Sequence, residues 1–261
     1  MRSAMIWLQV TGISSMITPF GAFALILLVT AYSRAPMQGR VKFEHPNSPR
    51  IFTTFSMVAR CLETFALGVC VATAVPAVGS VVPHVESSVG AIATQAHTNI
   101  SYGIKGLELL KKGLSPQTAL QAMLKEDSER ELRQVIIIDK DGRTGVFTGK
   151  KTADWKGHLV GANYVVAGNM LVGKEVIEAM AHEFESSEGE LSERLMKALE
   201  AGQRAGGDKR GKKSAALRVI NHQETRTRPF LDLRVDLHTE PVRELRRICD
   251  AYREWVFHNK R

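Results

Sequence analysis

Cysteine is scarce in this sequence and shows no regular spacing. Only Cys61, Cys70 and Cys249 occur in 261 residues, which is too few for a disulfide framework or a zinc site. Cys70 lies in an apolar strand pattern, and Cys249 lies on the apolar face of a helix pattern. We therefore interpret the cysteines as small buried hydrophobic residues, and we expect no metal and no cofactor.

A basic stripe interleaved with aromatic residues is also lacking. The formal net charge is +8, but half of it falls in residues 1–53, where five Lys and Arg residues outweigh a single Glu. The rest of the chain carries 30 basic residues against 26 acidic ones. This weak excess argues against nucleic-acid binding.

Charge is absent from the N-terminal segment between Ser3 and Ser33, where Ile, Leu, Val, Phe and Met dominate. Three interpretations stay open. Residues 5–31 could form a membrane anchor, since the run is long enough to cross a bilayer. It could instead be a signal peptide, although its basic start is minimal and no A-x-A site ends it. Finally, the start codon could be placed too far upstream.

The flanks of the apolar run indicate the orientation of an anchor. Four basic residues after the run outweigh Arg2, and they are Arg34, Arg40, Lys42 and Arg50. The positive-inside rule then places the C-terminal side in the cytoplasm. Without an anchor we expect a cytoplasmic protein. The sequence thus divides into an apolar segment 1–33, a Pro- and Gly-containing linker 34–53 and a domain 54–261.

Strand and helix patterns within 54–261 come in groups. Two helix patterns follow the first strands, two more follow the middle strands, and a last helix opens at Pro241. This grouping argues against a doubly wound sheet and for two packed sheets with helices on their outer faces, an α+β class. The strand patterns are Phe55–Ala59, Leu67–Thr73, Val78–Val82, Gly90–Ala96, Gln134–Ile138, Arg143–Thr148, His158–Val160, Tyr164–Ala167, Ser214–Ile220 and Leu231–Asp236.

Several polar residues stand where strands end. Gln95 and Asn99 lie at a strand exit, and Asn169 lies between a glycine and an apolar pair. Side-chain amides in such places can donate to a developing oxyanion, although more often they bridge loops. A Gly-Gly-Asp loop offers Asp208 and Arg210 as polar substrate contacts, or is simply a helix cap.

Charged residues alternate along the strand pattern near the C-terminus. Asp232, Arg234, Asp236 and His238 therefore share one face. That face is either a solvated set of ion pairs or part of a site. A metal hydrolase using Asp208, Asp236 and His238 is the weakest hypothesis, because so few ligands define no geometry.

Thr54 and Ser56 open the first strand pattern. A hydroxyl at a strand start is usually only a β-former. It gains chemistry if it becomes the chain terminus, because its own α-amine, with a pKa of about 8, can then accept the hydroxyl proton.

Many separated motifs resemble one known family, the domain of unknown function 1028 family, between about Thr54 and Ile248. Its members are placed with the N-terminal-nucleophile (Ntn) hydrolase-like folds. The matching stretches are Thr54–Arg60, Val78–Pro83, Gly90–Gln95, Tyr102-Gly103, Gly106–Leu110, Arg133-Gln134, Phe147–Gly149, Trp155, Gly157-His158, Gly206–Leu217 and Asp232–Asp236.

The resemblance implies a four-layer αββα sandwich of the Ntn-hydrolase type and amide-bond hydrolysis of a small or peptide-like substrate. Thr54 falls where the family chain begins, which makes it the candidate nucleophile, with Ser56 second and Asn169 or Gln95 steadying the oxyanion. Candidate substrate contacts are Asn99, His158, Asp208, Arg210, Arg234 and Asp236. Ntn-type folds often form homo-oligomers. The alternative is a non-catalytic ligand-binding domain tethered to a membrane.

Overall fold

The computed structural model describes residues 51–52, 54–221 and 231–258. They belong to a folded unit, Pro49–Arg261, that is separate from Met1–Ser48. No helix in this described part is long and apolar enough to cross a membrane. The candidate anchor 5–31 lies outside the described residues.

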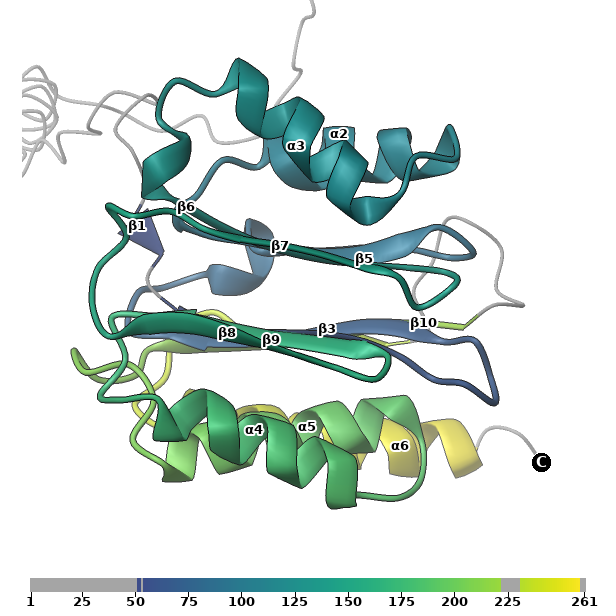
Figure 1. Ribbon diagram of the computed structural model, residues 1–261. Coiled ribbons are helices and arrows are strands. Elements are labelled where there is room, and N and C mark those ends of the chain that lie inside the picture. The colour runs from purple at the N-terminus through teal and green to yellow at the C-terminus, as the bar shows by residue number, and fades with distance from the viewer. Residues whose placement is uncertain (1–50, 53, 222–230, 259–261) are drawn as a thin grey trace, which may run out of the picture. The chain divides into compact units, whose positions relative to one another are not determined.

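Two antiparallel sheets form the centre of the unit (Figure 1). Sheet A has the order β1-β5-β6-β7, with β4 also paired to β5, and sheet B has the order β11-β10-β3-β2-β9-β8. The strands of sheet A are β1 (Ile51–Phe52), β4 (Pro83–Glu86), β5 (Gly90–His97), β6 (Arg133–Asp139) and β7 (Thr144–Thr148). Those of sheet B are β2 (Thr54–Arg60), β3 (Leu67–Thr73), β8 (Lys156–Gly161), β9 (Tyr164–Asn169), β10 (Ser214–Ile220) and β11 (Leu231–Val235).

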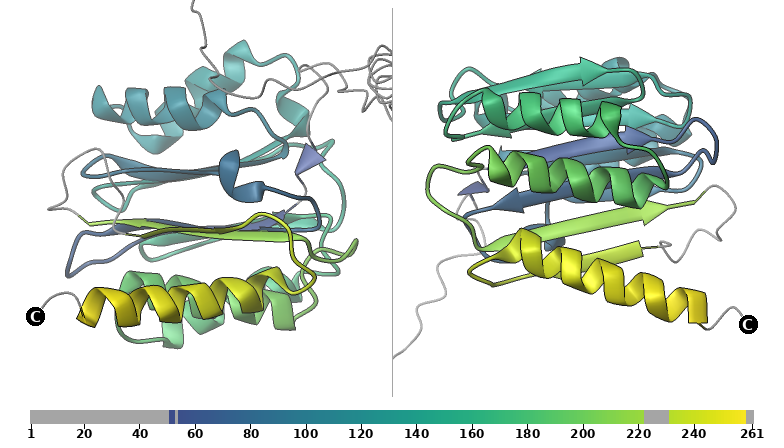
Figure 2. Two further views of the ribbon diagram at one scale, coloured as in Figure 1. Left: turned by 180° about the vertical axis from the view of Figure 1, so that it is seen from behind. Right: turned by 90° about the horizontal axis from the view of Figure 1, so that it is seen from below.

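Helices cover the outer face of each sheet, so the unit has four layers. Helices α2 (Ser101–Lys111) and α3 (Pro116–Glu126) lie on sheet A. Helices α4 (Glu175–Ser186), α5 (Leu191–Arg204) and α6 (Pro241–His258) lie side by side on sheet B (Figure 2). The expected α+β class with two packed antiparallel sheets is confirmed.

Alternating side chains divide the buried residues into three cores, one between each pair of layers. Along β2, Phe55, Met57 and Ala59 face the helices of sheet B. Val58 faces the other sheet. Because strand side chains alternate, Thr54 and Ser56 share the inter-sheet face with Val58. The third core lies between sheet A and its two helices.

The sequence sets the ends of several elements directly. Ser115 caps α3 by accepting the Thr118 amide at 3.2 Å, and Pro116 fills the first helical position. In the β6–β7 turn, Asp139 accepts the amides of Asp141 and Arg143, and Gly142 takes φ +82°. An Asp-Gly pair favours such a tight turn between two strands.

One strand prediction is wrong. Residues Val78–Ser80 form a single 3₁₀ turn, and the strand of this region is β4, which begins at Pro83. Val78, Val81 and Val82 are all buried in the inter-sheet core. Their spacing of three and four suits one turn of helix, whereas a strand would point Val81 and Val82 to opposite faces.

The chain changes sheets immediately before Thr54. Ile51 and Phe52 pair with His97 and Ala96 at the end of β5 in sheet A. Two residues later the chain enters β2 in sheet B. The last residues of the expected linker 34–53 thus belong to the folded unit, and they lead directly into the candidate nucleophile.

Candidate functional site

Several strand ends meet at the end of the sandwich where β2 begins. Register places Thr54 opposite Thr73, at the end of β3, and Ser214 also lies opposite Thr73. In sheet A, Gln95 near the end of β5 lies opposite Gln134 near the start of β6. Antiparallel neighbours alternate direction, so this single end collects residues that are far apart in the chain.

A buried chain of hydrogen bonds connects the two sheets at this end. The Ser56 hydroxyl donates to Gln95 Oε1 at 2.6 Å, and Gln95 Nε2 donates to Gln134 Oε1 at 2.7 Å. Asn169 Nδ2 donates to the same Gln134 oxygen at 2.9 Å. All four side chains are fully buried. We call Ser56, Gln95, Gln134 and Asn169 the amide cluster.

Gln134 is the centre of the amide cluster. Its oxygen accepts two bonds, and its Nε2 lies 3.0 Å from Thr148 Oγ1, 3.1 Å from the Gly157 oxygen and 2.9 Å from the Gly168 oxygen. The amide therefore ties strands β6, β7, β8 and β9 together. Its orientation is determined on every side, so the polar groups around it are held in place.

Thr54 lies at the edge of this cluster. Its side chain is fully buried, and it shares the inter-sheet face of β2 with Ser56. The next residues in register, Phe55 and Gly168, face each other across β2 and β9. Continuing the register by one residue places Thr54 beside Asn169. A nucleophile candidate and an amide candidate thus lie on adjacent strands.

The two predicted oxyanion donors are oriented but not saturated. Asn169 and Gln95 each use an N–H toward Gln134, and a primary amide has a second N–H to donate. Among the described residues, no donor reaches Oδ1 of Asn169 although this atom is buried. A buried acceptor without a donor is uncommon. Asn169 therefore keeps hydrogen-bonding capacity next to Thr54.

Ser56 is positioned differently from an attacking group. Its hydroxyl proton is given to Gln95, and the residue pairs in register with Val71 on one side and Ala167 on the other. The side chain is enclosed in mid-strand. Its role in the structure is to orient Gln95, so Thr54 remains the better nucleophile candidate.

His158 connects the amide cluster to the protein surface. Its Nδ1 lies 3.0 Å from Thr148 Oγ1, which also receives the Gln134 amide. Since Gln134 occupies the oxygen of Thr148 as an acceptor, the Thr148 hydroxyl is available to donate to His158. The imidazole itself lies exposed on β8.

Asp208 and Arg210 lie beside the end of β3. The Asp208 carboxylate is almost fully buried and accepts the Ala74 amide at 3.2 Å. Arg210 donates to the carboxylate through Nη2 at 2.7 Å and Nε at 3.1 Å. Ala74 follows Thr73, which lies opposite Thr54. The Asp208–Arg210 ion pair therefore supports the end of β3 next to the nucleophile candidate.

Arg234 and Asp236 form an exposed ion pair, with Arg234 Nη2 2.9 Å from both carboxylate oxygens. The structure therefore favours the solvated face over a substrate contact. Asp236 and Asp208 each engage a guanidinium, and no group of three potential metal-ligating residues occurs within the described ranges. These contacts lend no support to the metal-hydrolase hypothesis.

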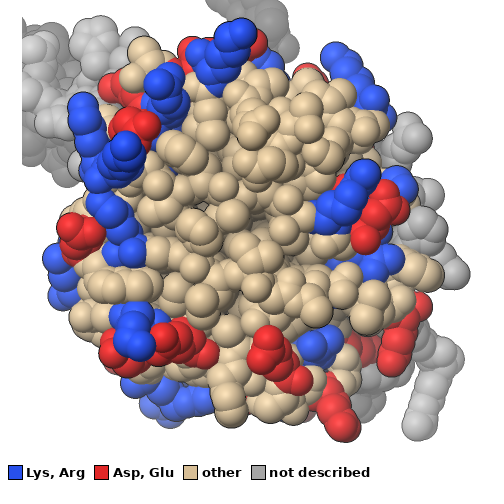
Figure 3. Space-filling model, in the orientation of Figure 1, with Lys and Arg blue, Asp and Glu red and all other residues tan. Residues whose placement is uncertain are grey.

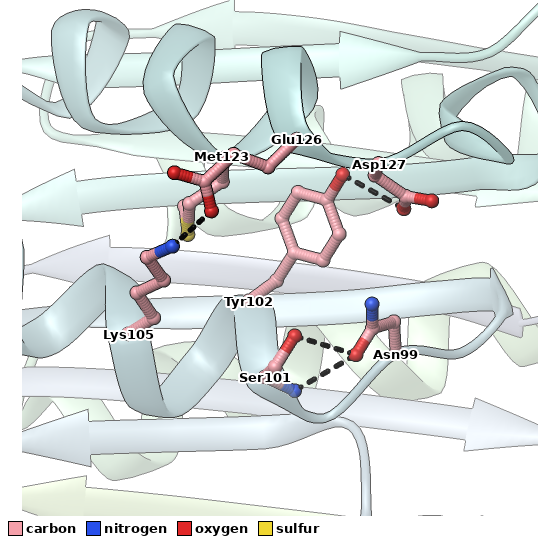
Figure 4. A pocket seen from close by; sticks show the side chains of 7 residues that line it. All are labelled: Asn99, Ser101, Tyr102, Lys105, Met123, Glu126 and Asp127. Carbon is pink, nitrogen blue, oxygen red and sulfur yellow. Dashed lines mark hydrogen bonds and ion pairs between the residues drawn. The ribbon is translucent and has the colours of Figure 1, made fainter.

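Asn99 lies apart from the amide cluster, at the start of α2. Its Oδ1 accepts the Ser101 amide at 3.0 Å and the Ser101 hydroxyl at 2.6 Å. It lines a hollow of about 190 Å³ between α2 and α3 (Figure 4). The charges there are already paired, Lys105 with Glu126 and Asp127 with Arg133. The Tyr102 hydroxyl also donates to Asp127 at 3.0 Å.

Sequence reasoning missed Gln134 and Thr148 as site residues. The sequence places Gln134 at the start of a strand pattern and in one of the family-like stretches, but neither gives its side chain a role. The available signal was an amide side chain inside a run of aliphatic residues, Gln134–Ile138, because a buried amide needs partners across the core.

Residues 54–245 match the family of unknown function DUF1028. The chain therefore belongs to this family, as its motifs indicated. It is also similar to a crystal structure, that of protein SPO2555 from Silicibacter pomeroyi, a member of the same family. The two share 31% sequence identity and a TM-score of 0.71, over 78% of this chain and 93% of the other. No curated protein matches the chain at a significant level.

Proposed function

We propose that the domain is an Ntn-type amide-bond hydrolase and that Thr54 is its nucleophile once Thr54 is the first residue of the chain. The observation that carries this proposal is the buried Thr54 at the start of β2, on the inter-sheet face beside Asn169. Two antiparallel sheets between helical layers are consistent with the Ntn-type sandwich.

The chemistry needs only groups at this end of the sandwich. The Thr54 oxygen attacks the substrate carbonyl carbon while the Thr54 α-amine accepts the hydroxyl proton. The second N–H of Asn169 or Gln95 donates to the oxyanion. The α-ammonium then gives its proton to the leaving amine, and water hydrolyses the Thr54 ester to release the acid.

The surroundings favour a small amide or peptide-like substrate. Buried amide groups offer both donors and an acceptor, since Asn169 Oδ1 lacks a donor among the described residues. A substrate N–H would satisfy that atom and be selected by it. The Asp208–Arg210 pair supports the adjacent loop.

The test compares a chain that begins at Thr54 with the same chain carrying Thr54→Ala. Both are assayed on a panel of small amides and dipeptides by release of the free amine. We expect turnover in the first protein and none in the second, with equal thermal stability. Equal hydrolysis by both proteins would refute the nucleophile.

A second candidate is a non-catalytic ligand-binding domain that keeps the upstream residues. The pairing of Ile51 and Phe52 with β5 favours it, because in that chain the Thr54 nitrogen is a peptide nitrogen and no base. It predicts saturable binding of small amides by the full-length chain without turnover, which calorimetry would measure.

A further inference from the structure

Two stretches of chain lie together beside the amide cluster. One, residues 149–156, leads from β7 of sheet A into β8 of sheet B, and the other, residues 206–213, leads from α5 into β10. Lys209 Nζ donates to the Asp154 carbonyl at 2.7 Å. Met170, which follows Asn169, bonds to one stretch through its amide and to the other through its carbonyl. We call these two stretches the basic loops.

The basic loops hold all of the excess positive charge of the domain. They contain three and four basic residues, against Asp154 and Asp208 alone. The domain 54–261 has 30 basic and 26 acidic residues, so its remainder has 23 against 24 and is nearly neutral. Glu131 and Glu240 approach the loops from outside and reduce this excess without cancelling it. Lys and Arg side chains line this end of the molecule, at the left edge of Figure 3.

Several of the basic side chains have no acidic partner. Lys150, Lys151 and Lys209 are exposed, and within the described residues none of their ammonium groups forms an ion pair. A rim of unpaired cations raises the local concentration of anionic ligands.

Lys156 brings a positive charge into the row of site residues across sheet B. It lies opposite Asn169 in the β8–β9 pair, and Thr54 lies on the other side of Asn169. Residues opposite each other in an antiparallel pair place their side chains on the same face, and Asn169 faces sheet A through its bond to Gln134. Lys156 therefore extends from the inter-sheet face that also holds Thr54, two strands away.

The Lys156 ammonium is held in a fixed position by the loop before it. Its Nζ donates to the carbonyls of Lys150 and Thr152, each at 2.7 Å. An ammonium has three N–H donors, so one is left for a ligand. The Asp154 carboxylate lies 3.4 Å away, longer than an ordinary hydrogen bond, and is 84% exposed. Such an exposed pair contributes little, so a ligand carboxylate can replace it.

We propose that the amide bound at Thr54 carries a carboxylate and that Lys156 binds this carboxylate. The inference rests on the proposed site at Thr54 and names the class of its substrate. Two interstrand spacings separate Thr54 from Lys156, or about 10 Å between Cα atoms. Extended peptide spans about 3.5 Å per residue. The carboxylate thus lies one or two residues beyond the scissile bond, as in acyl amino acids and short peptides with a free C-terminus.

The test compares two ligands of the same shape, N-acetyl-alanyl-alanine and its uncharged C-terminal amide. Calorimetry at low ionic strength measures their binding to the full-length chain and to the chain that begins at residue 54, both carrying Thr54→Ala to prevent hydrolysis. We expect the acid to bind about tenfold more tightly than the amide, since a hydrogen bond between charged groups is stronger than a neutral one. Equal binding of the two ligands, or no binding to either length of chain, would overturn the proposal.

Lys156→Gln, made in the same chains, tests the role of the ammonium. It removes the charge but keeps a donor for the loop carbonyls, and the preference for the acid should fall to about onefold. Lys140→Gln is the matched control, on an exposed lysine of the β6–β7 turn at the opposite end of the sandwich, and should leave the preference intact. A Lys156→Gln chain that is less stable but still prefers the acid would show that Lys156 only supports the loop. The comparison of acid with amide in chains that retain Lys156 tests the proposal even where Lys156→Gln does not fold.

Turnover by the chain that begins at Thr54 separates this inference from the proposed hydrolase. Equal hydrolysis of the acid and the amide would support the nucleophile and overturn the carboxylate site. Selective binding of the acid without any turnover would support the carboxylate site and refute the hydrolase.

Discussion

Replacing Gln134 with leucine tests whether the amide cluster holds the two sheets together. The change preserves size but removes one acceptor and one donor group in a fully buried position. It leaves Gln95 Nε2 and Asn169 Nδ2 without their common acceptor. A buried polar group that loses its partner costs about 1–3 kcal/mol. Two such groups give a loss of about 2–6 kcal/mol in the free energy of unfolding.

The assay is equilibrium unfolding in urea, followed by fluorescence and circular dichroism. Gln134→Leu alone does not separate lost hydrogen bonds from altered packing, so a double-mutant cycle with Asn169→Leu is needed. The double variant no longer contains the orphaned Asn169 amide. It should therefore be more stable than the sum of the single effects predicts, by about 1–3 kcal/mol.

Additive losses would refute this reasoning. Independent sites add within about 0.5 kcal/mol, so a coupling below that value would mean that Gln134 and Asn169 do not depend on each other. Val135→Ala is the matched packing control. Val135 is equally buried but faces the helices of sheet A, so it should show no coupling with Asn169→Leu.

Two further predictions concern ion pairs. Asp208→Asn should destabilise the fold by about 2 kcal/mol in thermal melts, less than for a fully buried pair because Arg210 is one-third exposed. Burial alone raises the pKa of Glu193, but hydrogen bonds and charge from Arg246 and Arg253 outweigh it and lower that pKa. Because folding lowers the pKa, the Glu193 carboxylate stabilises the fold at pH values above its unfolded pKa of about 4.3. This stabilisation is lost as the pH falls through the folded pKa. Glu193→Gln should thus cost about 1–2 kcal/mol at pH 7 and become neutral in strong acid, and an unchanged difference at pH 3 would contradict the assignment.

Local patterns predicted most of the fold because the physics that acts on each element is local. The Ser115-Pro116 start of α3 and the Asp-Gly turn after β6 depend on neighbours within a few residues. The grouping of strands and helices was enough to predict two sheets with helices outside. The 3₁₀ turn at Val78–Ser80 was not predictable in this way, because tertiary burial of three valines overrides their strand propensity.

The site was predictable only in part, because contacts between distant parts of the chain decide which side chains meet. Thr54, Ser56, Gln95 and Asn169 were candidates from their positions at strand ends, and the structure brings them together. Gln134, the partner of Gln95 and Asn169, lies on β6 of sheet A. Only the pairing of β5 with β6 and the packing of the two sheets bring it to them. Asn99 had the same sequence character as Gln95, yet local bonds to Ser101 occupy it.

The most direct test of Thr54 as an N-terminal nucleophile is the N-terminal sequence and intact mass of the protein purified from its native host. We expect a mature chain that begins at Thr54, with its α-amine free. An enzymatically active chain that still carries residues upstream of Thr54 would contradict it, because the Thr54 nitrogen would then be part of a peptide bond and could not act as the base.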